Sequence, residues 1–393
     1  MNSKIKATLR KFLSVVLAAL TVFGCAGAAF AAGSDASGTV NGVDWVYTSA
    51  DKTLVLSGSG TLGEGVADFG LFGGSWVAEH VKIGADVNIT TGRVFENFDF
   101  VDEYEVDANN KYLCNPDGVL MDKDKTVLIK YPAGSKEFSF YTVPDTVKTI
   151  SYRAFEFSSA LKTIFLNDGL ETIENFAFDN CGNLLYITIP GTVTSMGKGV
   201  LAQCNLLNKV TIEEGVTAIP EDAFDRCRSL ETVNLPDSLT TIGDIAFFGC
   251  TKLKTLKLPK NLQTFTDSPG RNFGGLNIAL TVDPENQYFS TDDLGVLYNK
   301  DKTLLYYCPN LPYTFDYTVR CDLNKYAFKG CENLRNVDIA YNLRAIPTYA
   351  FNGCKNLNTV TLPATLQRVD GAAFDSSLNT VNYRGTEELW KRS

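Results

Sequence analysis

A column of cysteines is the most prominent set of residues that could do chemistry in this chain of 393 residues. Each 23-residue segment supplies one thiol, without a C-x-x-C pair or a histidine partner, so the pattern is not that of a zinc site. Parallel side chains also make the torsion of a disulfide unfavourable, although neighbouring Cα atoms come within its range of about 4.4–6.8 Å. The column therefore indicates a buried ladder of small apolar side chains, with disulfides or a metal as open alternatives. Its members are Cys181, Cys204, Cys227, Cys250, Cys331 and Cys354, while Cys114, Cys308 and Cys321 lie off it.

Catalysis would depend on the single histidine, His80. A Ser-His-Asp or Cys-His site needs that residue, and no nucleophile motif such as G-x-S-x-G accompanies it. We therefore predict no catalytic residues and no cofactor, and we interpret His80 as a structural or surface histidine. A hydrolase stays open as an alternative if unpaired carboxylates gather in a concave pocket.

Asp117, Asp122 and Asp124 lie close together in the sequence and could suggest a calcium site. The glycine at position 6 and the bidentate glutamate at position 12 of a calcium loop are absent, however. A second copy of the segment has Asn299 in place of Asp122. We therefore predict that these aspartates form turns and that the chain has no metal site.

A repeat positions all of these residues. It is clearest at Val216–Ser238, in letters VTAIPEDAFDRCRSLETVNLPDS, and its period of 23 residues indicates a solenoid whose units bury their apolar faces against each other. Leu201 takes the place of one phenylalanine in the series. The recurring phenylalanines are Phe155, Phe178, Phe224, Phe247, Phe328, Phe351 and Phe374.

Two kinds of local structure follow from the spacing within a unit. The segment from Leu230 to Leu235 ends in a period-2 pattern and predicts a short strand that Pro236 ends. The step from Ala223 and Phe224 to Cys227 predicts a helical or 3₁₀ turn on the opposite side. The predicted fold is thus a repeat solenoid with short parallel strands on its concave face and helical turns on its convex face.

Hairpins interrupt and cap this solenoid. Asp44–Tyr47 and Thr53–Ser57 predict a β-hairpin that covers the first coil. Later, the segment 106–126 matches the segment 282–303, each with the letters Gly-Val-Leu before a Lys-Asp-Lys-Thr turn. We interpret both as hairpins inserted between coils, and their duplication assigns them to the architecture.

The repeat in Val216–Pro236 resembles the BspA-like class of bacterial leucine-rich repeats. The inserts and the tail Asn382–Trp390 are similar to that family as well. Departures are Leu201 for Phe, Ser158 and Ser377 for Cys, and a broken repeat at 262–282. The resemblance implies a leucine-rich-repeat fold and an exported or surface protein with a binding role.

The N-terminus carries an export signal. Four basic residues precede an apolar run, Phe12–Phe23, and Ala29-Phe30-Ala31, which predicts a signal peptide over residues 1–31 cleaved after Ala31. A lipoprotein signal with a lipid anchor at Cys25 is the alternative. No apolar run reaches the ~20 residues of a transmembrane span. Removing residues 1–31 changes the net charge from −9 to −13, which disfavours nucleic acid and anionic membrane as partners.

The outward positions of the predicted strands are the candidate binding surface, because solenoids use such sheets to bind partners. Exposed aromatic residues on neighbouring strands are plausible contact anchors. We therefore expect an extracellular protein or glycan partner on the concave face, as in an adhesin. A structural envelope protein without a specific ligand is the alternative. The candidate contact residues are Phe165, Tyr186, Thr188, Lys209, Thr211, Asn234 and Lys257.

These observations divide the chain into eight segments. They are the signal peptide (1–31), the hairpin cap (32–66), divergent first repeats (67–106), the first hairpin insert (107–142), repeats (143–282), the second hairpin insert (283–319), further repeats (320–383) and the C-terminal tail (384–393).

Overall fold

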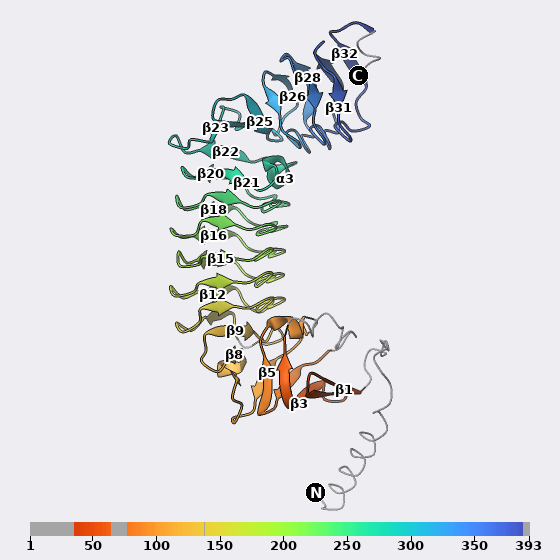
Figure 1. The fold of residues 1–393 in the computed structure, drawn as a ribbon. Coiled ribbons are helices and arrows are strands. Elements are labelled where there is room, and N and C mark those ends of the chain that lie inside the picture. Colours follow the sequence, from red (N-terminus) through yellow and green to blue (C-terminus); the bar gives the residue numbers. More distant parts are fainter. Residues whose placement is uncertain (1–34, 64–76, 97, 137, 388–393) are drawn as a thin grey trace, which may run out of the picture.

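The computed structural model describes residues 35–63, 77–96, 98–136 and 138–387, which form a solenoid of stacked coils (Figure 1). Predictions that concern the signal peptide, Cys25 and Trp390 fall outside these residues. No helix in the described part of the chain is long and apolar enough to cross a membrane.

One side of the coils is a parallel sheet, which we call the first sheet. Its strands alternate inward apolar residues such as Ile187 and Val210 with exposed outward ones, as a strand with one buried face should. Its strands, in hydrogen-bonded order, are β10 (Phe140–Thr142), β12 (Thr163–Phe165), β14 (Tyr186–Ile189), β16 (Lys209–Ile212) and β18 (Thr232–Asn234). The following coils add β20 (Thr255–Leu258), paired with β22 (Ala279–Val282).

A second sheet of two-residue strands, which the repeat pattern did not predict, forms another side. Each repeat unit begins with an apolar residue, and a second apolar residue follows three positions later. In the unit that begins at Leu170 this second residue is Ile173, whose side chain points from the second sheet into the core. It consists of two hydrogen-bonded groups along the same side. The first group contains β11 (Thr149–Ile150), β13 (Thr172–Ile173) and β15 (Ser195–Met196), and the second contains β17 (Ala218–Ile219), β19 (Thr241–Ile242) and β21 (Thr264–Phe265).

Turns form the third side, where the spacing predicts helical or 3₁₀ turns. In the unit of Phe224, three N–H groups donate to the next coil: Asp222 to Asp244 (3.1 Å), Phe224 to Ala246 (2.8 Å) and Arg226 to Phe248 (2.7 Å). Asp222 and Arg226 have φ of 57° and 56°, outside the helical region. In a helix these N–H groups would bond to carbonyls of the same coil. Here they bond to the next coil, so no helical turn forms. Within the coils, one turn is replaced by a short α-helix, α3 (Pro269–Phe273).

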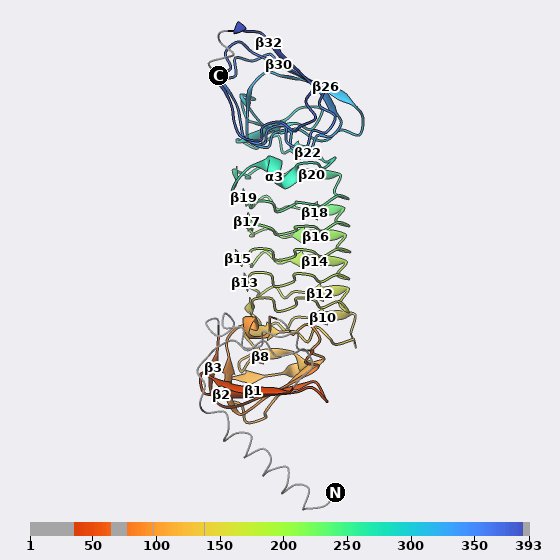
Figure 2. The same cartoon turned by 90° about the vertical axis from the view of Figure 1, so that its right-hand side faces the viewer.

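The same bonding explains a difference in shape. The sequence predicts strands on a concave face, whereas the middle coils stack in a nearly straight column (Figures 1 and 2). Packed helices on the far side would stand about 8–10 Å apart, against about 4.8 Å between strands, and would bend the column. Here the rings of Phe155 and Phe178, on the turn side, are only 5.2 Å apart. The spacing between neighbouring coils is therefore similar on the turn side and in the first sheet, and the column stays straight.

A stack of aromatic rings runs through the interior. Phe273 from α3 packs 5.7 Å from Phe247 and 5.5 Å from Tyr307, and so restores the column in the broken repeat at 262–282. The Asn272 side chain accepts from the Phe247 N–H (3.3 Å) in place of the missing backbone carbonyl. A short helix thus replaces the usual turn without interrupting the core.

The two inserts have the same arrangement. The first contains β7 (Leu113–Cys114), η2 (Pro116–Gly118), β8 (Leu120–Asp122) and β9 (Val127–Lys130), and the second contains β23 (Phe289–Thr291), β24 (Leu297–Asn299) and β25 (Leu304–Tyr307). The last strand of each pairs in parallel with a two-residue strand of the next coil: β9 with β11 of the second sheet, and β25 with β27 (Asp322–Leu323) in a separate sheet. At each insert the first sheet is interrupted, because β6 (Glu103–Val106) does not pair with β10, nor β22 with β26 (Phe315–Val319).

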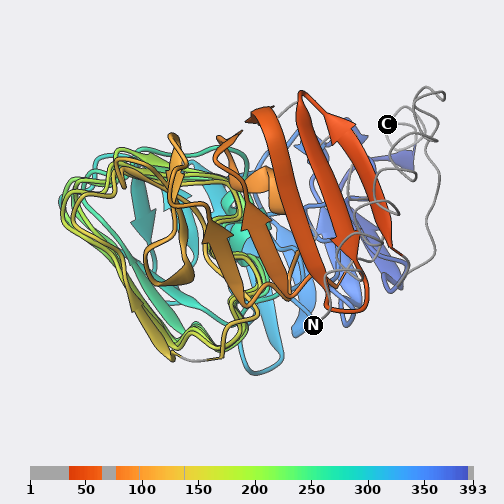
Figure 3. The same ribbon diagram turned by 90° about the horizontal axis from the view of Figure 1, so that it is seen from below.

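The N-terminal segment begins with three antiparallel strands, one more than the predicted hairpin, and these join the first coils, seen from below in Figure 3. β3 continues beyond the predicted hairpin strand, and its two halves pair in parallel with β4 and β5. The segment comprises β1 (Ala36–Val40), β2 (Val43–Thr48), β3 (Thr53–Leu62), β4 (His80–Ile83), β5 (Asp86–Ile89), η1 (Gly92–Phe95) and β6 (Glu103–Val106).

The C-terminal segment repeats the coil geometry with its axis turned relative to the middle coils, so its coils are seen end-on in Figure 2. Its first-sheet strands are β26 (Phe315–Val319), β28 (Leu334–Ile339), β30 (Thr359–Leu362) and β32 (Thr380–Tyr383), and β29 (Ala345–Ile346) pairs with β31 (Arg368–Val369). Buried apolar residues form three clusters, one for each segment.

Candidate binding face

The predicted contact residues all lie at outward positions of the first sheet and its continuation in β20. Strand pairing places them in two rows along the coils, which we call the strand face. One row is Phe140, Thr163, Tyr186, Lys209 and Thr232, and the other is Thr142, Phe165, Thr188, Thr211 and Asn234, with Lys257 in the next coil.

Three exposed aromatic side chains gather at the start of this face. Phe140, Phe165 and Tyr186 are 57%, 53% and 51% exposed and lie on the adjacent strands β10, β12 and β14. Phe140 was missed because residues 107–142 were assigned to the insert. Its position, 23 residues before Thr163, is the sequence signal that could have identified it.

A small hollow lies between two of these aromatic residues. It has a volume of about 170 Å³, and Phe165, Tyr186 and Thr188 line it together with the carboxylates of Asp168 and Glu213. Apolar rings beside a few polar groups are the usual lining of a binding site. The hollow is too small to enclose a ligand, so it suits a single side chain or sugar substituent of a larger partner.

The far end of the strand face is held by local contacts. Lys257 Nζ lies 2.8 Å from Asp283 Oδ2, and Asn234 Nδ2 donates to Thr211 Oγ1 (3.2 Å). These pairs use polar groups that a partner would otherwise contact. The aromatic end is therefore the stronger candidate for the contact surface.

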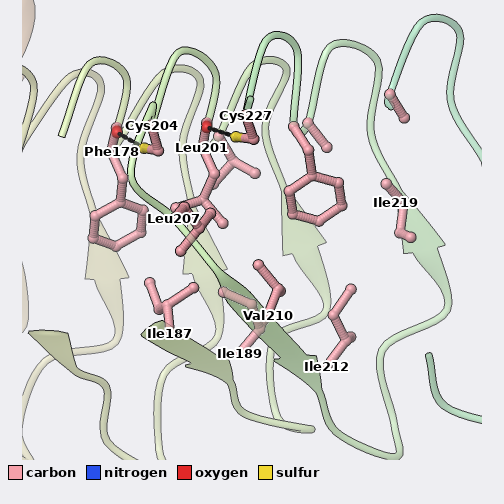
Figure 4. Close-up of a cluster of buried hydrophobic side chains, with 14 of the residues drawn as sticks. Phe178, Ile187, Ile189, Leu201, Cys204, Leu207, Val210, Ile212, Ile219 and Cys227 are labelled. Carbon is pink, nitrogen blue, oxygen red and sulfur yellow. Dashed lines mark hydrogen bonds between the residues drawn. The ribbon is translucent and has the colours of Figure 1, made fainter. Parts of the chain in front are cut away.

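The cysteine column is a ladder of free, buried thiols (Figure 4). Each thiol donates to a main-chain carbonyl of the preceding coil, as Cys204 does to Phe178 (3.2 Å) and Cys227 to Leu201 (3.1 Å). Ser377 Oγ also donates to a carbonyl of the preceding coil, that of Cys354 (3.1 Å), so a serine hydroxyl can take the place of the thiol. Burial raises the pKa of the Cys181, Cys227 and Cys331 thiols well above the ordinary value.

The predicted turn aspartates do form turns. Asp122 Oδ1 accepts from the N–H groups of Thr126 and Val127, both at 2.7 Å. Asn299 Oδ1 accepts from Thr303 (2.8 Å) and Leu304 (2.9 Å) in the second insert. Only one acceptor oxygen is needed, so Asp and Asn are interchangeable here. Among the described residues no group of three or more His, Cys, Asp and Glu could hold a metal ion.

His80 lies in β4 at the edge of a larger hollow near β10. Asp102, Glu103 and Asp117 line the same hollow, which is the carboxylate cluster that would favour a hydrolase. All three side chains are exposed to solvent. A general acid needs an apolar environment that keeps its proton, so this cluster does not favour hydrolysis.

Comparison with solved structures finds other leucine-rich repeat proteins. A leucine-rich repeat protein from Eubacterium ventriosum is 19% identical, over 68% of this chain and 100% of that chain, with a TM-score of 0.42. A leucine rich cell surface protein from Faecalibacterium prausnitzii is 20% identical, over 91% and 97%, with a TM-score of 0.47. The pneumococcal vaccine antigen PcpA is 20% identical, over 90% and 82%, with a TM-score of 0.48. Comparison with curated proteins found no match.

The family model of the BspA type leucine rich repeat region matches six copies, over residues 133–254, 217–269 and 305–389. These ranges contain the coils with the aromatic stack and the thiol ladder. The chain belongs to the BspA-type leucine-rich repeat proteins.

Proposed function

We propose that this chain is exported, released or held at the cell surface, and binds an extracellular protein or glycan through the aromatic end of the strand face. The observation that carries the proposal is the group Phe140, Phe165 and Tyr186 on three adjacent strands. Large exposed apolar residues that gather in one place are typical of interaction sites. In this proposal residues 1–31 are removed on export, or Cys25 carries a lipid anchor.

The chemistry of the face supports a rigid contact surface. Its backbone is fixed by parallel pairing on both sides of β12 and β14, so the aromatic rings lose little conformational freedom when a partner binds. Thr163 and Thr188 place hydroxyl groups beside the rings. Rings and hydroxyls together suit either a protein segment or the flat face of a sugar.

The test is a binding screen of residues 32–393 against extracellular-matrix proteins, mucins and glycans. The variant Phe165→Ala/Tyr186→Ala should weaken a saturable interaction by at least about tenfold, because truncated anchors commonly cost 2 kcal/mol or more. Tyr313→Ala/Tyr341→Ala is the control, since it removes two exposed rings from loops of the C-terminal segment.

Two outcomes would contradict the proposal. Equal binding by the wild type and the Phe165/Tyr186 variant would place the contact elsewhere. A screen without any saturable binding would favour a structural role in the envelope without a specific ligand.

A further inference from the structure

The interruption of the first sheet between β6 and β10, which we call the first break, leaves a strand edge without a partner. β10 is the terminal strand of the order β10-β12-β14-β16-β18, and no described strand pairs with its outer edge. An open edge presents backbone N–H and C=O groups that can pair with another chain.

The backbone groups that point to this edge can be identified. Ser139 O accepts from Thr163 N (3.3 Å), and Val143 N donates to Phe165 O (2.9 Å), so both residues face β12. Alternate residues of a parallel strand face the same neighbour. The N–H and C=O groups of Phe140 and Thr142 therefore point away from β12.

A hollow of about 850 Å³ lies along this edge. β10 supplies Phe140, Tyr141 and Thr142 to its lining, and β6 and η2 supply Glu103 and Asp117 from the opposite side. The volume is in the range of ligand sites. The edge of β10 thus borders a groove and is not covered by the described part of the chain.

The charge of the groove selects the partner. Its lining has the carboxylates of Asp102, Glu103 and Asp117 against the single ammonium group of Lys136. None of the three carboxylates forms an ion pair with a residue in the described part of the chain. A partner with positive side chains would complement them.

The second insert provides an internal comparison. Its interruption between β22 and β26 has the same topology, and Gly295 lies against Ala279 as Gly118 lies against Glu103. There the Tyr317 hydroxyl of β26 donates to the Tyr298 hydroxyl of β24 (2.7 Å), which in turn donates to Asp292 (3.1 Å), and these side chains bridge the space. Met121 stands at the position of Tyr298 in the first break and has no hydroxyl group to close it.

The carboxylates are also particular to the first break. By alignment of the two inserts, Asp102, Glu103 and Asp117 correspond to Ile278, Ala279 and Leu294. The shared architecture therefore requires none of these charges. Both the open groove and its negative lining distinguish the first break from the second.

We propose that the first break binds an extended basic peptide segment, which adds as a strand to the outer edge of β10 with its lysine or arginine side chains facing Asp102, Glu103 and Asp117. Addition to a sheet edge takes its affinity from main-chain hydrogen bonds and its specificity from alternate side chains. This site goes beyond the proposed function, which uses the outward face of the strands rather than their edge.

The probes are two fluorescein-labelled peptides of about eight residues, the usual length range of a strand, one alternating valine with lysine and one alternating valine with glutamate. Anisotropy titrations use residues 32–393. The lysine peptide should bind saturably, and the glutamate peptide at least about tenfold more weakly. Asp117→Asn/Glu103→Gln should reduce that difference.

Proline substitution tests the backbone pairing. Thr142→Pro removes an outward N–H that makes no bond within the sheet, so the fold should tolerate it as edge strands do, while the lysine peptide should bind at least about tenfold more weakly. Thr318→Pro is the matched control, because Thr318 has the equivalent position in β26, and it should leave binding unchanged.

Three results would overturn this proposal: no saturable binding of the lysine peptide, equal binding of both peptides, or wild-type affinity in Thr142→Pro. Phe165→Ala/Tyr186→Ala should leave the peptide affinity within about twofold. The edge site and the outward face are thereby tested separately.

Discussion

At the scale of single residues, most side chains that could do chemistry are instead bonded to the backbone. The thiols donate to carbonyls of the preceding coil, and Asp122 accepts turn N–H groups. Where the chain of a solenoid turns between strands, many main-chain N–H and C=O groups lack a hydrogen bond within a sheet. Those that are buried must bond to side chains or to other backbone groups. Conspicuous polar residues in such repeats are therefore weak evidence for catalysis.

The thiols should be unreactive in the folded protein. Burial disfavours the thiolate, which is the reactive form, and raises the pKa of Cys227 and Cys331. Labelling with a maleimide at pH 8, followed by mass spectrometry, should modify the partly exposed Cys114 first. Rapid labelling of Cys227 without denaturant would contradict the buried ladder.

Asp179 should make stability depend on pH. It is 7% exposed, and burial raises its pKa from 3.8 to about 6. The unfolded chain then loses this proton at lower pH than the folded chain. The associated stability is present below about pH 3.8 and is lost as pH rises through about 6.

Asp179→Asn should therefore raise the free energy of unfolding at pH 7 by about 3 kcal/mol and have little effect at pH 3.5. Urea unfolding at both pH values measures this, with the exposed Asp168→Asn as control. A variant less stable than wild type at pH 7 would show that the ionised carboxylate is needed.

The turn role of Asp122 gives a prediction about calcium. Asn299 makes the same backbone bonds without a charge, so Asp122→Asn should preserve the melting temperature. Adding calcium or EDTA should shift it by less than about 1 °C, since a ligand that does not bind the folded state does not stabilise it. A calcium-dependent rise lost in Asp122→Asn would revive the metal site.

At the scale of elements, each insert is anchored by a buried asparagine. Asn286 donates to Pro259 O (2.8 Å) and Leu262 O (2.9 Å) and accepts from Tyr288 N and Phe289 N (both 2.8 Å). Asn110 makes the equivalent four bonds in the first insert. One side chain thus forms hydrogen bonds with four backbone groups at the point where the chain leaves the regular coil and enters the insert.

Asn286→Ala should lower the free energy of unfolding by at least about 3 kcal/mol, because buried groups left unpaired cost about 1–3 kcal/mol each. Urea unfolding followed by circular dichroism measures the loss. The neighbouring, exposed Gln287→Ala should change it by less than about 0.5 kcal/mol. Equal stability of the two variants would mean that water replaces the asparagine.

The sequence predicts the elements that recur with the 23-residue period, but it does not predict the elements that leave no periodic pattern. The spacing of Phe224 and Cys227 predicted the buried columns, and these are observed. The second sheet was missed because its two-residue strands, such as Thr172–Ile173, are too short for a period-2 pattern. Helical turns were wrongly favoured because residues such as Asp222 adopt positive φ, which their residue types do not reveal.

At the scale of the whole molecule, the candidate site lies at the boundary between an insert and the regular coils. The middle column is straight because all three sides bond from coil to coil, and the axis turns at both ends of it, near the first and the second insert (Figures 1 and 3). The exposed rings and the open edge of β10 both lie where the first insert gives way to regular coils. Phe165 and Tyr186 were predicted from their outward positions, whereas Phe140 and the edge needed the strand pairing.

The central claim is that this end of the strand face contacts the partner. A photoreactive benzoylphenylalanine at Thr188, between the two rings, tests it against the same side chain at Thr361, which has the equivalent outward position in β30. With a partner from the binding screen, we expect a crosslink from position 188 and none from position 361. Crosslinking from position 361 alone would place the contact on the C-terminal segment instead.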